Sequence, residues 1–296
     1  MNSSIHQAVL LNETIEGLNI QPNAWYIDAT FGRGGHTQAI LNKGANVVAF
    51  DVDQSAIDHG QTEMSEEIES GKLILIRANF RELAQQLASL RPEVKQNIQG
   101  ILFDFGTTVD QLKDTQRGFS FESDSELDMR MDDRLGVKAK DLLALIDENQ
   151  LTLLFQEYGG EESSRAIAKA ICTERQRHPI TTTKQLVSII ERIKRNRGHL
   201  HPATKVFQAL RIAVNSELEN IREALPQAIE VLQQGGRLVT IAFHEGEDRI
   251  AKQSMKAWEE QNSGEQQTKK PIEASETELQ TNPRARSAKL RIFIKK

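Results

Sequence analysis

The sequence predicts an α/β protein in which a helical insertion interrupts a doubly wound, parallel sheet. Short apolar runs alternate with helical stretches near the N-terminus, the middle of the chain has helical spacing alone, and strand-like runs return near the C-terminus. We expect residues 1–111 and 215–296 to form one sheet domain and residues 112–214 to form an inserted helical domain.

Four apolar runs in the first part of the chain are typical of buried strands. Each is followed by a stretch that favours a helix or a turn, so right-handed crossovers would place the strands side by side in a parallel sheet. The predicted strands are residues 24–31 (AWYIDATF), 46–53 (NVVAFDVD), 72–80 (KLILIRANF) and 98–106 (IQGILFDFG).

The middle of the chain, from Gln111 to about Gly198, is predicted to form a loop followed by helices. The TTTKQ segment has the pattern of a capped helix start. Residues 201–233 form a long helical region, and Pro226 is expected to separate two helices there. Strand signals return in the GGRLVTIAF and AKLRIFIKK segments. Between them, residues 262–281 are polar and are expected to form a mobile loop.

The composition is ordinary for a soluble globular protein, with 38% hydrophobic and 27% charged residues among 296. No stretch resembles a membrane span, and the N-terminus lacks the basic start and apolar run of a secretory signal. Cys172 is the only cysteine, which excludes an intramolecular disulfide and argues against a cysteine-based metal site. We therefore expect a cytoplasmic protein.

Charge is distributed unevenly along this chain of net charge −5. Residues 165–211 contain eleven Lys/Arg against two Glu, a net charge of +9, and residues 282–296 contain six basic residues and no acidic one. Such segments are typical either of a surface that faces a polyanion or of a solvated helix face.

The segment YIDATFGRGGHTQAIL, residues 26–41, joins the end of a strand to the start of a helix through three glycines. Such a turn lets the backbone approach a nucleotide-like ligand at the carboxyl edge of a sheet. Its G-x-G-G spacing differs from the G-x-G-x-x-G of dinucleotide enzymes, and the P-loop Lys-Ser/Thr pair is missing.

Aspartates end three of the predicted strands: Asp28, Asp51 and Asp104. Asp51 is placed to accept hydrogen bonds from ribose hydroxyls. Together with the glycines, these acidic ends favour a ligand with a ribose, a cationic centre and an amino-acid tail, namely S-adenosylmethionine. The alternative is that the aspartates only cap the following helices.

Six blocks, in order over nearly the whole chain, are similar to those of one bacterial enzyme family. They are HQAVLLNETIEGL, YIDATFGRGGHTQAIL, QLKDTQRGFSFESDSELDMRMD, HPATKVFQALRIAVNSELE, GGRLVTIAFHEGEDRI and NPRARSAKLRI. The chain thereby resembles the ribosomal RNA small subunit methyltransferase H family. The resemblance implies a Rossmann-like class I S-adenosylmethionine-dependent methyltransferase sheet. It also implies N4-methylation of a cytosine in the decoding region of small-subunit ribosomal RNA.

The resemblance further implies roles for individual residues. The cofactor-binding residues would be Gly34, Gly35, His36, Asp51, Phe80, Asp104 and Gln111. For catalysis we consider Asp104, Asp110 as an acceptor for the target amine, and His244 at a strand end. The inserted helical domain would help to hold the RNA, as free small-subunit RNA or in the 30S particle.

The chain departs from the family pattern at three places. Thr107–Asp110 replaces Val-Ser-Ser-Pro, Ser125 and Glu126 replace Gly-Pro, and Glu245 and Gly246 replace Ser-Leu. One alternative is therefore a catalytically weak or silent RNA-binding relative. A nicotinamide-dependent Rossmann oxidoreductase is a further alternative, which the glycine spacing disfavours.

No metal site is predicted, because neither His36 nor His244 has a second histidine at i+3 or i+4, and His199 and His201 are only two apart in a loop. Phe119 and Phe121 are candidates either to touch the target base or to fill the core. The sequence leaves open whether the long helices form a homodimer interface.

Basic residues near the C-terminus have two possible roles. They either contact RNA phosphates, which position RNA without reading its sequence, or protect an edge strand. The residues in question are Arg284, Arg286, Lys289 and Arg291.

Overall fold

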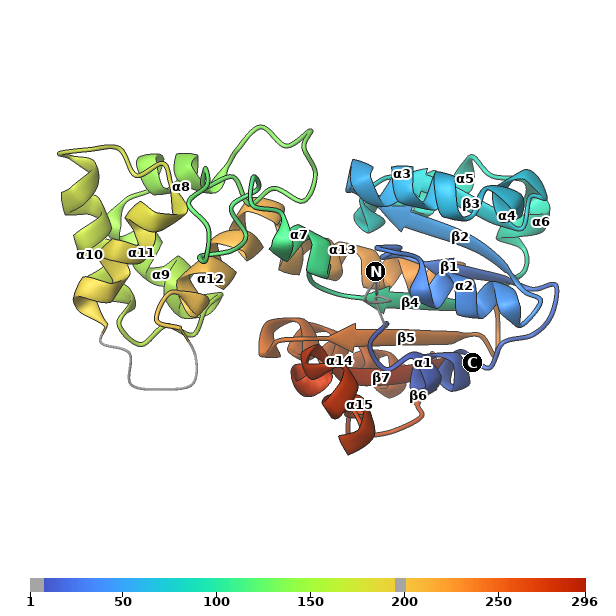
Figure 1. Ribbon diagram of the computed structural model, residues 1–296. Coiled ribbons are helices and arrows are strands. Elements are labelled where there is room, and N and C mark those ends of the chain that lie inside the picture. The colour runs from blue at the N-terminus through green and yellow to red at the C-terminus, as the bar shows by residue number, and fades with distance from the viewer. Residues whose placement is uncertain (1–7, 195–200) are drawn as a thin grey trace. The chain divides into compact units, whose positions relative to one another are not determined.

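The structure is a computed structural model that describes residues 8–194 and 201–296. The chain forms two compact units, one of Met1–Gly106 and Leu218–Lys296 and the other of Thr107–Glu217. The first unit contains a seven-stranded sheet (Figure 1). Its strands are β1 (Trp25–Asp28), β2 (Asn46–Asp51), β3 (Leu73–Arg77), β4 (Ile98–Asp104), β5 (Arg237–Ala242), β6 (Gly264–Gln266) and β7 (Lys289–Lys295).

The strand order is β3-β2-β1-β4-β5-β7-β6. Strands β1 to β5 pair in parallel, and β7 runs antiparallel between β5 and β6. Because β2 and β3 lie on one side of β1 and the later strands on the other, the winding reverses between β1 and β4. This confirms the predicted doubly wound α/β sheet and puts its switch point at the carboxyl ends of β1 and β4.

Helices cover both faces of the sheet. On one face, a Cβ added to Gly17 would lie 2.9 Å from Cδ1 of Ile292, so α1 packs closely on β7. The next residue, Phe293, points to the opposite face, where its ring meets Trp258 of α14 with 5.4 Å between ring centroids. The helical segments of this unit are α1 (Leu11–Leu18), α2 (Gly35–Asn42), α3 (Gln54–Glu63), α4 (Ser65–Glu69), η1 (Phe80–Glu82), α5 (Leu83–Ala88), α6 (Pro92–Lys95), α13 (Glu217–Val231, which starts one residue before the unit boundary), α14 (Glu245–Glu260), α15 (Glu276–Thr281) and η2 (Pro283–Ser287).

The second unit is helical and has its own apolar core. Leu151, Phe155, Ile167 and Ile171 are fully buried in it, because each helix turns one apolar face inward. Its helices are α7 (Val109–Lys113), α8 (Ala139–Leu145), α9 (Glu148–Glu157), α10 (Ser164–Arg175), α11 (Thr183–Ile193) and α12 (Thr204–Asn215). Thr182 caps α11, as the TTTKQ segment predicts.

The prediction that Pro226 separates two helices is wrong. Helix α13 continues through Pro226. The carbonyl that loses its partner belongs to Arg222, which like Pro226 is exposed, so water can bind it. The break lies earlier, at Ser216, whose φ of 50° ends α12 in the left-handed region.

The prediction of a mobile loop over residues 262–281 is also wrong. This segment contains β6 and α15, and Ile272 exchanges two backbone hydrogen bonds of 2.8 Å with Leu290 of β7. Its polar composition reflects its position along the outer side of β7. Within the described part of the chain, no helix combines the length and apolar character needed to cross a membrane.

Candidate active site

Asp28, Asp51 and Asp104 are the last residues of β1, β2 and β4. Because these strands are parallel neighbours, their carboxyl ends meet at one edge of the sheet, at the switch point. The three acidic strand ends predicted from the sequence are therefore brought together. Their surroundings differ, and so do the tasks that each can perform.

Asp28 is held by its own turn. It is 1% exposed, and its carboxylate accepts hydrogen bonds from Oγ1 of Thr37 at 2.7 Å and from the N–H of Thr30 at 3.2 Å. Burial raises the pKa of Asp28. Oγ1 of Thr30 also accepts a hydrogen bond from the N–H of Asp104 at 2.7 Å, which ties β1 to β4. Asp28 therefore stabilises the loop instead of presenting its carboxylate to a ligand.

Asp51 closes the glycine turn. Its Oδ2 accepts a hydrogen bond from the N–H of Gly32 at 2.8 Å, and its Oδ1 accepts one from the N–H of Asp53 at 2.9 Å. Gly34 has a φ of +74°, and a Cβ there would lie 2.6 Å from Cε of Met64, so the turn requires glycine. Burial raises the pKa of Asp51 to about 6. A carboxylate offers about four lone-pair sites, so Asp51 can also accept ribose hydroxyls.

His36 and Asp104 form a buried pair next to this turn. His36 is 5% exposed, and its Nε2 lies 3.6 Å from Oδ2 of Asp104. Among the described residues, neither ring nitrogen of His36 nor Oδ1 of Asp104 has a hydrogen-bond partner. Burial acts to lower the pKa of His36, but Asp104 and Asp28 outweigh it and raise that pKa. Buried polar atoms without partners are rare, so this pair fits the polar groups of a ligand.

Phe80 provides an aromatic wall at the same edge. Its ring meets Phe103 edge-on, with 5.5 Å between ring centroids, and lies 6.2 Å from the ring of Phe105. Phe103 and Phe105 flank Asp104 in the sequence. The residue predicted to contact adenine therefore belongs to a cluster at the end of β4, which suits the flat face of a base.

His244 follows β5 and caps α14. Its Nδ1 accepts a hydrogen bond from the N–H of Gly246 at 3.1 Å, and its Nε2 lies 3.2 Å from Oε1 of Glu247. Oε2 of Glu247 accepts a hydrogen bond from the N–H of Phe243 at 2.7 Å. A Cβ on Gly106 would lie 3.6 Å from the Phe243 ring, so this cluster stands beside the end of β4. Nδ1 of His244 thus caps α14, and its Nε2 faces Glu247 but makes no hydrogen bond with a described residue. The cap and the Glu247 contact indicate a positioning role.

The sequence interpretation did not single out Thr30, Thr37 or Glu247. One feature of the sequence could have identified Glu247. It precedes the buried Ile250 and Ala251 by three and four residues, so helical spacing puts it on the core-facing side of α14. A carboxylate at such a position requires hydrogen-bond donors.

Asp110 and Gln111 lie in α7, in the second unit. Oγ1 of Thr108 accepts a hydrogen bond from the N–H of Gln111 at 3.2 Å, and Oε1 of Gln111 accepts one from the N–H of Thr108 at 3.0 Å. This capping box gives Gln111 a structural task. Its role toward the cofactor, and that of Asp110 in catalysis, stay predictions.

The other two departures from the family pattern also have local partners. The Glu126 carboxylate contacts Lys140 and lies 2.9 Å from Nζ of Lys138, and these two cations lower the pKa of Glu126. Gly246 leaves room for the His244 ring, since a Cβ there would lie 3.1 Å from Nδ1.

Arg291 is buried and paired with Asp248 on a strand that is not at the sheet edge, so both predictions are wrong for it. It is 4% exposed, and its Nε and Nη2 donate hydrogen bonds to the two carboxylate oxygens of Asp248 at 2.7 and 3.0 Å. Strand β7 is not an edge strand, because β5 and β6 flank it.

Phe119 belongs to the core of the second unit and is 6% exposed, as the packing alternative predicts. The Phe121 ring stacks on the ring of His201, with 4.3 Å between centroids. His199, and the basic residues Arg195 and Arg197, lie outside the described residues.

The comparisons with known proteins agree over the whole length of the chain. The profile of the MraW methylase family matches residues 3–296. Ribosomal RNA small subunit methyltransferase H of Desulfotalea psychrophila is 45% identical, with 98% of each chain covered. The protein of the same name from Coprothermobacter proteolyticus is 40% identical, with 98% of this chain and 96% of that protein covered.

A solved structure described as an rRNA methylase from Streptococcus thermophilus covers 96% of this chain and 94% of its own. Its 11% identity and TM-score of 0.45 are too low to add to the assignment. The chain belongs to the MraW methylase family.

Proposed function

We propose that the protein transfers a methyl group from S-adenosylmethionine to N4 of a cytosine in the decoding region of small-subunit ribosomal RNA. The observation that carries this proposal is the buried His36–Asp104 pair, whose partnerless polar atoms lie next to a glycine turn in a chain of a methylase family. The name of the two relatives supports ribosomal RNA of the small subunit as the substrate.

The residues at the strand ends fit S-adenosylmethionine. Asp51 would accept hydrogen bonds from the ribose hydroxyls, and Phe80 would lie against the adenine. Gly34, Gly35 and the unpartnered ring nitrogens of His36 would hold the amino-acid tail. When bound, this cofactor supplies an electrophilic methyl group on a sulfonium.

Asp104 is our candidate for the group that acts on the cytosine. The N4 amine is a poor nucleophile because its lone pair is delocalised into the ring. Oδ1 of Asp104 would accept a hydrogen bond from the amine, orient it, and take its proton as the new N–C bond forms. Such alignment can contribute ~7–11 kcal/mol in well-oriented systems. His244 would act through Glu247 and the end of β5 as a positioning residue.

The test is mass spectrometry of nucleosides from 30S particles, and from free small-subunit RNA, incubated with the protein and labelled cofactor. We expect N4-methylcytidine at one decoding-region position with the wild-type protein. Asp104→Asn should lower turnover by about 100-fold or more, in the range of a lost general base. Asp110→Asn tests the alternative acceptor, and unchanged turnover would remove Asp110 from the mechanism.

Calorimetry with S-adenosylmethionine provides the control for these variants. Tight cofactor and RNA binding without methylated product would instead support a catalytically silent relative. We further expect a cytoplasmic protein, and analytical ultracentrifugation of the full chain would show whether it forms a homodimer.

A further inference from the structure

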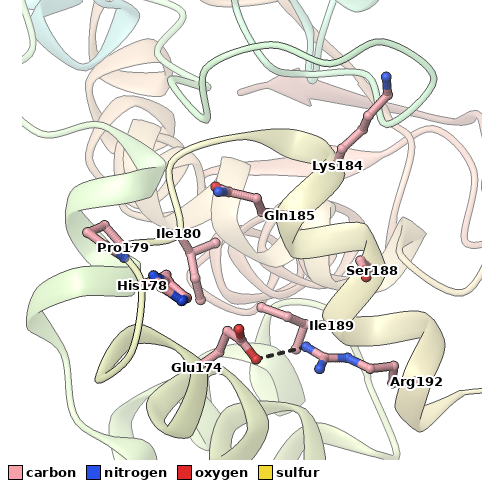
Figure 2. A pocket seen from close by; sticks show the side chains of 9 residues that line it. All are labelled: Glu174, His178, Pro179, Ile180, Lys184, Gln185, Ser188, Ile189 and Arg192. Carbon is pink, nitrogen blue, oxygen red and sulfur yellow. Dashed lines mark hydrogen bonds and ion pairs between the residues drawn. The ribbon is translucent and has the colours of Figure 1, made fainter.

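The second unit contains a pocket that the methyl-transfer site does not use (Figure 2). It has a volume of about 390 Å³, within the range of small-ligand sites. One wall is the face of α11 that carries Lys184, Ser188 and Arg192, which are spaced four residues apart and so lie on one side of the helix. The other wall is the end of α10 and the segment that follows it, with Glu174, His178, Pro179 and Ile180.

The charges at this pocket favour an anion. Lys184 lies in the first turn of α11, where its charge adds to the positive end of the helix dipole. It forms no ion pair with a residue in the described part of the chain. Arg192 is 59% exposed and pairs with Glu174 through Nη2 at 3.0 Å. A guanidinium has five N–H donors, so this contact leaves Arg192 able to bind a phosphate as well.

The floor of the pocket suits a nucleobase. Ile180 and Ile189 are 5% and 2% exposed and form its apolar base, and the rings of His178 and Pro179 stand at one side of it. Oε1 of Gln185 accepts hydrogen bonds from the N–H groups of Thr181 and Thr182, so its amide nitrogen is the group available to a ligand. Unpaired bases of single-stranded RNA bind such combinations of flat, apolar and polar side chains.

We propose that this pocket holds one nucleotide of a single-stranded RNA segment, with its phosphate at Lys184 and Arg192 and its base over Ile180 and Ile189. The nucleotide is not the one that is methylated. Nucleic acid is favoured over a small anion because Arg177, which is exposed and precedes the pocket residue His178, can contact a further phosphate. The inference rests on the proposed RNA substrate.

The experiment compares two double variants of the full chain that remove the same charge. Lys184→Gln with Arg192→Gln alters the pocket, whereas Arg165→Gln with Lys169→Gln alters exposed residues of α10 that do not line it. The probe is a fluorescein-labelled single-stranded oligoribonucleotide with the decoding-region sequence, titrated by anisotropy at several salt concentrations. Circular dichroism and cofactor calorimetry check that both variants are folded.

We expect the pocket variant to bind the probe about tenfold more weakly at low salt. Two lost phosphate contacts should reduce the slope of log K against log salt by about 1.4, at roughly 0.7 per contact for single strands. The α10 variant should change affinity by less than about threefold on the same scale. Equal losses in the two variants would overturn the proposal, because they would indicate unspecific attraction to the basic segment.

A second measurement locates the nucleotide directly. RNA containing 4-thiouridine is cross-linked to the wild-type protein by light, and the modified peptide is identified by mass spectrometry. We expect cross-links within residues 178–192, and bound RNA that cross-links only elsewhere would overturn the proposal. Methylation of the same RNA is assayed in parallel. If the RNA is methylated but does not cross-link to residues 178–192, only the proposed role of the pocket is contradicted. If the RNA cross-links there but is not methylated, only the proposed activity is contradicted.

Discussion

The two units of the molecule treat their carboxylates in opposite ways. At the strand ends of the first unit, burial raises the pKa of Asp51 to about 6, and the carboxylate contacts the backbone N–H groups of Gly32 and Asp53. In the second unit, Lys140 and Lys138 lower the pKa of Glu126. Neutral N–H groups thus hold the Asp51 carboxylate, whereas two lysines neutralise the Glu126 carboxylate.

Two buried pairs within the first unit differ in a similar way: Arg291–Asp248, which stabilises the fold, and His36–Asp104, at the proposed ligand site. Arg291 and Asp248 are both buried there, but they pair with each other through two hydrogen bonds. His36 and Asp104 are also close, at 3.6 Å, but no hydrogen bond joins them, and both ring nitrogens of His36 have no hydrogen-bond partner among the described residues. In Arg291, by contrast, only Nη1 has none, because Nε and Nη2 bind Asp248.

The largest effect should come from breaking the buried scaffold pair. Asp248→Ala leaves the Arg291 guanidinium buried without its carboxylate, and we expect a loss of about 3–5 kcal/mol in the free energy of unfolding. The control is Glu260→Ala on the same helix, whose 3.5 Å pair with Lys256 is about two-thirds exposed and should contribute less than about 1 kcal/mol. Urea denaturation measures both. Similar losses would remove the distinction between buried and exposed pairs.

The glycine turn should be the next most sensitive. Gly34→Ala imposes a left-handed side-chain residue, at a cost of about 1–2 kcal/mol, and adds contacts of 2.6 Å to Met64 and 2.9 Å to Phe31. Gly160→Ala in the second unit has a similar φ of +59° but meets nothing within 4 Å. We expect Gly34→Ala to be the more destabilising in urea and to weaken cofactor binding. Equal unfolding free energies would show that the packing around Gly34 is not restrictive.

The raised pKa of Asp51 predicts that cofactor binding depends on pH. Its carboxyl is ionised above a pKa of about 6 and protonated below it. Because the ionised form is the better acceptor for ribose hydroxyls, affinity should fall by up to about tenfold per pH unit below that pKa. Calorimetry with S-adenosylmethionine at pH 7.5, 6.5 and 5.5 measures this. Asp51→Asn should bind weakly at every pH, and if it keeps the wild-type pH profile another group, such as His36, is responsible.

The smallest effect is expected at Glu126, where the chain departs from the family pattern. Its side chain is 39% exposed, so Glu126→Gln should cost less than about 1 kcal/mol despite the two lysines. Methyl transfer should change by less than about twofold, a fold-change that corresponds to well under 1 kcal/mol. A much larger fall in turnover, without loss of stability, would show that this departure tunes activity.

The strands and their acidic ends could be predicted because buried parallel strands are short apolar runs whose last residue is read directly from the sequence. The cap at Thr182 was similarly accessible, since capping depends on residues three apart. These features are local. The resemblance to a family added proposed site residues, such as Phe80 and Gln111, that no local pattern gives.

The failed predictions concern features decided by distant residues or by solvent. Arg291 is 43 residues from Asp248 in the sequence, and no residue near Arg291 indicates that it pairs with Asp248. The polar segment 262–281 is ordered by backbone pairing with β7, which its composition does not reveal. Pro226 is tolerated because its missing hydrogen bond falls on an exposed side of α13.

The chain leaves the first unit after Gly106 and returns to it only at Leu218. During translation β4 is therefore made before its neighbour β5, and β7, an interior strand, is made after both of its neighbours β5 and β6. The inserted unit is continuous and can form its core while the nascent sheet still has an unpaired edge along β4. Completion of the sheet thus awaits the synthesis of β7, so a ribosome that stalls before β7 would release a chain prone to aggregate.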